Sequence, residues 1–88
     1  MSTEETLLEF PCQFPIKAMG LADGEFEALI ITLVRKHAPE LHEGAVKSRD
    51  SQSGKYISVT VTVTASSKEQ LDNIYRELTA HEKVLMAL

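Results

Sequence analysis

Apolar and polar residues alternate most regularly between Tyr56 and Ala65. Apolar residues occupy one set of alternate positions and hydroxyl residues the other: Ile57, Val59, Val61 and Val63 against Ser58, Thr60, Thr62 and Thr64. A period of two with β-branched side chains on both faces is typical of a strand. We therefore expect a central strand whose isoleucine and valine row faces the core and whose serine and threonine row faces outward.

The segment that follows Asp23 has the three-and-four spacing of an amphipathic helix. Its apolar positions, counted from Glu25 onward, are Phe26, Leu29, Ile30, Leu33, Val34 and His37. Asp23 is the expected N-cap, and Pro39 stops the helix. One helix is therefore predicted between these two residues.

A second helix is predicted after the central strand. Ser66 and Ser67 are alternative N-caps, because each is followed three residues later by a Glu or Gln that completes a capping box. The apolar stripe consists of Leu71, Ile74, Tyr75 and Leu78. His81 and Glu82 are expected to close this helix.

Three weaker segments complete the predicted elements. Phe14–Leu21, Glu43–Ser51 and Val84–Leu88 are the expected first, second and last strands, and a polar turn of hairpin length, residues 51–54, follows the second. In the second strand, Lys47 and Arg49 lie on the same side. Residues 1–6 are polar and are expected to be disordered.

The order strand, helix, strand, strand, helix, strand predicts one α+β domain over residues 1–88. Two helices with one apolar face each must share one side of the sheet. The right-handed crossover rule then gives an antiparallel sheet with strand order 4-1-3-2. This is the ferredoxin-like βαββαβ sandwich.

Composition narrows the possible partners. The 88 residues carry a formal net charge of −4, with a sequence pI of about 5.3. A nucleic-acid partner is disfavoured, because affinity for phosphate comes largely from basic residues. No apolar run is long enough to cross a bilayer, and the N-terminal segment is acidic where a signal peptide would be basic. We expect a cytoplasmic protein with no membrane partner.

Residues able to carry chemistry are few. Cys12 is the only cysteine, so no internal disulfide can form, and its neighbours supply no group that would activate the thiol. His37, His42 and His81 stand at no known metal-ligand spacing. The carboxylates fall mainly at helix positions that should be solvated, such as Glu25, Glu27, Glu69, Glu77 and Glu82. We therefore predict no catalytic residue, no metal, no cofactor and no enzymatic activity.

The predicted fold hosts several activities, and the sequence disfavours three of them. The loop after the first strand lacks the two cysteines of a metallochaperone and the arginine of an acylphosphatase. An RNA-recognition module needs aromatic residues on the central strand, where this chain has only Tyr56 at the start.

The outward face of the sheet is the remaining candidate surface. It would be either a solvated sheet face or a platform for another sheet, a partner or a small ligand, with these residues as contacts: Lys17, Lys47, Arg49, Ser58, Thr60 and Thr62. Lys47 and Arg49 also fit a second role, because charges on an edge strand prevent unwanted strand pairing.

Several segments resemble the YbeD-like family of small bacterial ACT-like proteins, sometimes labelled lipoic acid-binding regulatory proteins. The matching segments are Leu7–Pro11, Lys17–Gly20, Arg35–Pro39, Gly54–Val61, Glu69–Leu71, Ile74–Leu78 and Val84–Leu88. The resemblance covers nearly the whole chain and implies the same βαββαβ fold. ACT domains bind amino acids beside the first strand–helix loop, often as dimers. The resemblance therefore implies a ligand-binding loop in this chain that consists of Met19, Gly20, Asp23 and Gly24.

These observations lead to one functional hypothesis and two alternatives. The first is a non-enzymatic regulatory or interaction module of ACT-like type, forming a homodimer and sensing a small metabolite, which is lipoate-related by the family label alone. The second is an adaptor that binds an unidentified protein partner and no small ligand. The third is an RNA-binding module.

Overall fold

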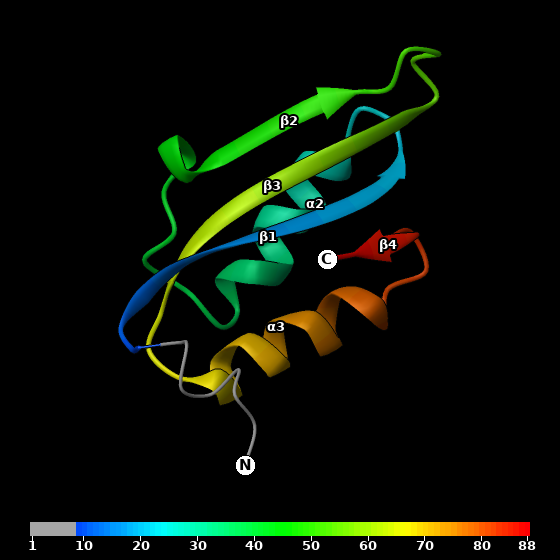
Figure 1. The fold of residues 1–88 in the computed structure, drawn as a ribbon. Helices are drawn as coiled ribbons and strands as arrows, with labels where there is room; N and C mark the ends of the chain where they lie inside the picture. Colours follow the sequence, from blue (N-terminus) through cyan, green and yellow to red (C-terminus); the bar gives the residue numbers. More distant parts are fainter. Residues whose placement is uncertain (1–8) are drawn as a thin grey trace.

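A computed structural model describes residues 9–88, so the predicted disorder of residues 1–6 falls outside the described range. The elements follow in the predicted order along the chain (Figure 1): β1 (Cys12–Leu21), α2 (Phe26–Arg35), the 3-10 turn η1 (Glu43–Ala45), β2 (Val46–Asp50), β3 (Tyr56–Ala65), α3 (Lys68–Thr79) and β4 (Met86–Ala87). The βαββαβ arrangement is confirmed.

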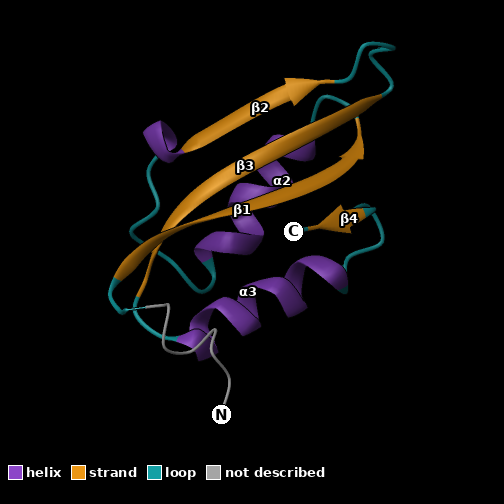
Figure 2. Cartoon of the chain, in the orientation of Figure 1, coloured by secondary structure: helices purple, strands orange, loops and turns teal. Residues whose placement is uncertain are grey.

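The strands form one antiparallel sheet in the order β2-β3-β1-β4, which confirms the predicted order 4-1-3-2. The two central strands pair along their full length, from Cys12 opposite Ala65 to Leu21 opposite Tyr56. The helices form the second layer of the molecule (Figure 2).

The core lies between the sheet and the helices. The inward row of β3 is buried as predicted, with Val59, Val61 and Val63 at most 1% exposed. The inward row of β1 and the helices complete it through these buried residues: Ile16, Ala18, Phe26, Ile30, Leu33, Val34, Leu71, Ile74 and Leu78. The period-two and period-3.6 patterns therefore meet in one core, and the other sheet face is left without a layer among residues 9–88.

The first strand begins at Cys12, two residues earlier than predicted, and includes Pro15. The N–H and C=O of Lys17 both bond to Leu88, so the same groups of Pro15, two residues earlier, point to the same side of the sheet. No described strand lies beyond Leu88 on that side. Pro15 is therefore tolerated, because its missing N–H has no ladder partner to lose.

The second strand is shorter than the predicted Glu43–Ser51. Residues 43–45 form η1, in which the Ala45 N–H bonds to the His42 C=O at 3.0 Å, and pairing with β3 begins only at Val46. Ser51 lies in the turn. Pairing of the last strand extends beyond β4, because the Leu85 N–H bonds to the Met19 C=O at 2.8 Å.

The helix starts differ in how far they match the prediction. Asp23 is not the N-cap of α2; Glu25 holds that position, and Asp23 Oδ1 accepts the Glu25 N–H at 2.9 Å in a turn before the helix. Ser67 is the N-cap of α3, because its Oγ accepts the Gln70 N–H at 3.1 Å. Of the two predicted caps, Ser67 is therefore correct.

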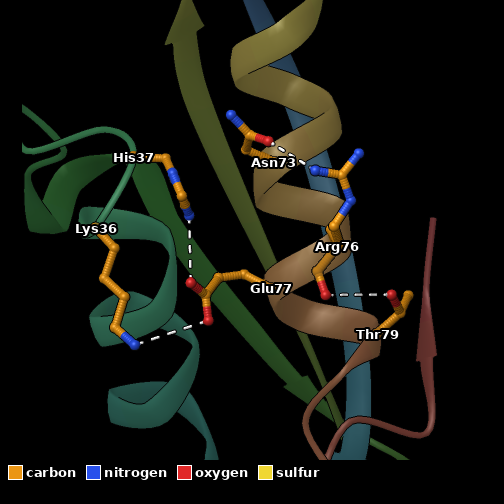
Figure 3. A network of polar contacts seen from close by, with 6 residues as sticks. All are labelled: Lys36, His37, Asn73, Arg76, Glu77 and Thr79. Carbon is orange, nitrogen blue, oxygen red and sulfur yellow. Dashed lines mark hydrogen bonds and ion pairs between the residues drawn. The ribbon is translucent and has the colours of Figure 1, made fainter.

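Polar contacts join the two helices where they face each other (Figure 3). Glu77 of α3 lies 3.3 Å from His37 Nε2 and 3.7 Å from Lys36 Nζ. Gln70 Nε2 donates to the His37 C=O at 2.7 Å. α2 ends at Arg35, so His37 lies just past the helix and not on its apolar face. This network is on the helix side of the molecule, away from the uncovered sheet face.

Candidate functional site

The uncovered face of the sheet brings together side chains from all four strands. The strand register defines two neighbouring rows across it: Leu88, Lys17, Thr60 and Lys47, then Met86, Met19, Ser58 and Arg49. Leu21 and Tyr56 form the next pair at one end, and Gln13 and Thr64 form the last pair at the other. We call this surface the outer face.

One end of the outer face is apolar. We define the apolar patch as Met19, Leu21, Tyr56, Met86 and Leu88. Leu88 is 64% exposed, Leu21 51% and Met86 50%. With Leu85, the patch contains all the exposed large hydrophobic side chains of residues 9–88. Apolar side chains gathered on one surface of so small a domain are typical of a contact site.

The charges on the outer face are all positive. Lys17, Lys47 and Arg49 lie on it, no outward position of β1, β2, β3 or β4 is acidic, and none of the three cations forms an ion pair within residues 9–88. Lys55 adds a cation beside the patch, with its Nζ 5.6 Å from the centre of the Tyr56 ring. This face is therefore cationic on a chain whose net charge is −4.

The structure places the predicted partner residues together. Lys47 stands opposite Thr60 and Arg49 opposite Ser58, and Lys17 and Thr62 lie on the same face. The sequence analysis missed Leu21, Met86 and Leu88. Leu21 could have been predicted from the sequence, because it lies two residues from Met19 and four from Lys17 in one strand and so faces the same side of the sheet.

The structure divides the predicted ligand loop between two surfaces. Met19 and Gly20 lie in β1, and only Asp23 and Gly24 belong to the loop. The Met19 side chain is on the outer face, whereas Gly20 faces the helices, where the space a Cβ would need is taken by the Phe26 ring and the Lys83 C=O. Gly20 is therefore required for packing at this point.

The polar groups of the loop already have partners. Asp23 Oδ1 accepts the Glu25 N–H at 2.9 Å, and Asp23 Oδ2 lies 3.3 Å from Lys83 Nζ. The Glu25 N–H, with a smaller contribution from Lys83, holds the pKa of Asp23 below its ordinary value. Gly24 has φ +84°, a conformation that favours glycine. Turn geometry accounts for each of these residues.

The other titratable candidates lie apart from one another. Cys12 is half-buried at the start of β1. His37 pairs with Glu77, His81 Nδ1 accepts the Lys83 N–H at 3.2 Å, and His42 is exposed at the edge of the outer face. Burial raises the pKa of Tyr75 on the helix side. Over residues 9–88, no three His, Cys, Asp or Glu side chains come close enough to hold a metal ion.

None of the helices within residues 9–88 has the length and apolar character that a membrane span requires.

Comparison with known proteins identifies the family. A family model described as "Protein of unknown function (DUF493)" matches residues 5–88. A UPF0250 protein of Chromobacterium violaceum is 52% identical over 89 residues and covers 100% of both chains. A UPF0250 protein of Janthinobacterium sp. (strain Marseille) is 52% identical over 84 residues, which is 96% of this chain and 92% of that protein.

Among solved structures, the protein HP0495 from H. pylori has the same fold. The two superpose with a TM-score of 0.71 at 15% sequence identity, over 92% of this chain and 85% of the other. The chain belongs to the DUF493 family of small bacterial proteins. The UPF0250 proteins are similar to this chain over nearly all of its length. The YbeD-like resemblance found in the sequence is confirmed.

Proposed function

We propose that this DUF493 protein is a non-enzymatic interaction module that binds an acidic and apolar surface of another protein through its outer face. One observation carries the proposal: the apolar patch adjoins a surface where, among residues 9–88, the charged side chains at outward strand positions are all cations, although the chain as a whole is acidic. The proposal corresponds to the protein-binding part of the adaptor hypothesis.

Charge complementarity supports an acidic partner. Lys47 and Arg49 on β2 and Lys17 on β1 flank the apolar patch and are unpaired within residues 9–88. A partner carboxylate would gain an ion pair without displacing an existing one. Such charges steer association and fix the register of a complex, while buried apolar anchors supply most of the affinity.

A second copy of this chain fits the outer face less well. A symmetric dimer formed face to face would use the same surface on both copies. Lys17, Lys47 and Arg49 would then approach the same three cations of the other copy, and no outward strand position in the described part of the chain is acidic to compensate. The homodimer hypothesis is therefore ranked below a complex with a different protein.

A nucleic acid also fits less well. The patch places Leu21, Met86 and Leu88 at one end of the face, where phosphates would gain nothing from aliphatic side chains. Tyr56 is the only aromatic residue on the outward positions of the strands, so bases would find one stacking partner at most.

The metabolite-sensing hypothesis gains no support at the predicted ligand loop, because Gly20 is covered and both Asp23 oxygens are engaged.

We propose a cytoplasmic location. A chain with one cysteine has no disulfide scaffold of the kind that secreted domains use, which supports this assignment.

Site-specific photocrosslinking in cells tests the proposal. A photoreactive amino acid replaces Met86 in the apolar patch, and a matched control variant carries it at Glu69, which is exposed on α3 on the opposite side of the molecule. We expect one protein to be crosslinked from position 86 and not from position 69. The crosslinked peptide should contain acidic and apolar residues.

Binding of the purified crosslinked protein provides the quantitative step. Arg49→Glu should weaken binding about tenfold and reduce its dependence on salt, because it reverses a charge at the interface. Lys68→Glu, on α3, should leave affinity unchanged. The proposal fails if position 86 crosslinks to a second copy of the chain or to RNA, or if Arg49→Glu binds as tightly as the unmodified protein.

A further inference from the structure

The outer face contains a second feature at the end opposite to the apolar patch. A hollow of about 440 Å³ opens there between β3, the start of β1 and the segment that leads from η1 into β2. It is lined by polar side chains, which include Gln13, His42, Lys47, Thr60, Thr62 and Thr64. We call it the polar hollow. Its volume lies within the range of small-ligand sites, which is about 300–1,000 Å³.

The fold brings these groups together from distant positions in the sequence. Gln13 stands opposite Thr64 across the β1–β3 ladder, and Lys47 stands opposite Thr60 across the β2–β3 ladder. The chain leaves the sheet at η1, so β3 has no β2 partner beyond the pair of Val46 and Val61. The hollow therefore opens beside Thr62 and Thr64.

The lining can donate hydrogen bonds but has no negative charge. It offers the Lys47 ammonium, three threonine hydroxyls and the Gln13 amide, and none of the lining residues within 9–88 is Asp or Glu. None of these side chains has a hydrogen-bonded or ionic partner within residues 9–88. Thr60 and Thr62 are only partly exposed, so their hydroxyls are held in place by the sheet.

A carboxylate in an adjoining hollow sets a limit on the site. Glu40 lines a smaller adjoining hollow of about 250 Å³ that shares His42, Thr62 and Thr64. A bound anion is therefore favoured on the Lys47 side of His42, away from Glu40. The shared residues leave room for the uncharged part of a ligand to extend over Ala45.

We infer that the polar hollow binds a small molecule through an oxyanion, either a phosphate or a carboxylate, held by Lys47 and the threonine hydroxyls of β3. Charge-assisted hydrogen bonds to such an anion are stronger than those between neutral groups. This site is separate from the apolar patch, but it shares Lys47 with the cationic surface of the proposed interface, so an oxyanion and a partner carboxylate would compete for that side chain.

NMR titration of the full chain tests the inference with two probes, inorganic phosphate and succinate. Chloride at equal ionic strength controls for general screening. We expect at least one probe to shift the amide signals of Gln13, Lys47 and Thr60–Thr64 with saturation in the millimolar range. A response to phosphate alone or to succinate alone identifies the kind of oxyanion.

Two variants make the test specific. Lys47→Gln should weaken probe binding about tenfold, as expected for the loss of one charged contact. Lys68→Gln removes a lysine that is also exposed but lies on α3, paired with Asp72, and should bind as the unmodified protein does. Thr62→Val, which keeps the shape of a residue in the strand, should weaken binding as well.

The inference is overturned if the shifts follow ionic strength alone, if they centre on Lys17 or the helices, or if Lys47→Gln leaves the titration unchanged. The signals of residues remote from the hollow report in the same spectra whether each variant is folded.

Discussion

Substitution of Gly20 by alanine tests the packing that the structure places where a ligand loop was predicted. An added Cβ would stand 2.7 Å from the Lys83 carbonyl oxygen and would also collide with the edge of the Phe26 ring. Neither neighbour can move freely. Phe26 is 2% exposed within the core, and the Lys83 oxygen belongs to the backbone that leads into β4.

The expected cost follows from the lack of space. Overpacking by one methyl group in a well-packed site costs about 1–3 kcal/mol. For a chain of 88 residues, each 1 kcal/mol lowers the Tm by about 4–8 °C. Gly20→Ala should therefore melt roughly 4–24 °C below the unmodified protein.

Urea unfolding followed by circular dichroism measures the free energy of unfolding of both proteins. Gly44→Ala is the matched control, because a Cβ there would meet its nearest atom, His42 Nδ1, at an ordinary 3.4 Å. The control should stay within about 0.5 kcal/mol of the unmodified protein. Equal stability of Gly20→Ala and Gly44→Ala would refute the packing argument and return Gly20 to the candidates for ligand contact.

A double variant identifies the obstructing side chain. Phe26→Leu removes the ring edge beside Gly20 and has its own cost as a core substitution. If the ring is the main obstacle, Gly20→Ala should be less harmful in the Phe26→Leu background than alone, giving a favourable coupling energy. Additive costs would instead indicate that the Lys83 carbonyl group carries the clash.

Three further predictions concern the core, a helix cap and an exposed ion pair. Ile74→Ala should lower the free energy of unfolding by about 2–5 kcal/mol, measured by urea unfolding, because Ile74 is 0% exposed. Ser67→Ala should lower the free energy of unfolding by about 1 kcal/mol in the same assay. Ser67→Asp should lower it little, because an aspartate side chain can also accept the Gln70 N–H and cap the helix. The pKa of Asp23 is lowered in the folded state, so its contribution to stability is present above the ordinary carboxyl pKa of about 3.9 and is lost as the pH falls through the lower folded value. Asp23→Asn should therefore weaken the dependence of stability on pH between pH 5 and pH 2, and an unchanged acid-unfolding profile would contradict this assignment.

The fold could be predicted because the sequence patterns agree with one another. The alternation over Tyr56–Ala65 gives both the strand and the face it buries, and it limits the β1–β3 register to pairings that keep the buried rows on one side. The helix stripes around Ile30 and Ile74 need one common surface, which leaves a single side of the sheet for both helices.

Local hydrogen bonding decided the points at which the prediction was wrong. Asp23 has the residue type of an N-cap, but its carboxylate accepts the N–H of Glu25, which is itself the N-cap, in the turn directly before the helix. Residues 43–45 fall within the predicted second strand, yet the Ala45 N–H bonds locally to the His42 C=O and these residues form η1. Sequence patterns do not distinguish these local bonds from the ladder or helix bonds they replace.

The candidate site was only half predictable, because the apolar patch depends on the register of the last strand. Val84–Leu88 is apolar throughout, so its sequence does not indicate which residues face outward. The paired hydrogen bonds between Lys17 and Leu88 fix that register and place Met86 and Leu88 on the outer face. A shift by one residue would turn both side chains inward.

Because the strand register decides which side chains face outward, the net charge of the whole chain does not describe the charge of the outer face. A value of −4 for the chain argued against an anionic partner, but the acidic side chains are absent from the outward positions of the strands, where Lys17, Lys47 and Arg49 are unopposed. Because charges separated by more than about 10 Å are largely screened at ordinary salt, a partner bound to the sheet responds to those nearby cations more than to the total. An acidic protein can therefore have a binding face for acidic groups, and once the register is fixed, the alternation of the strands shows where that face lies.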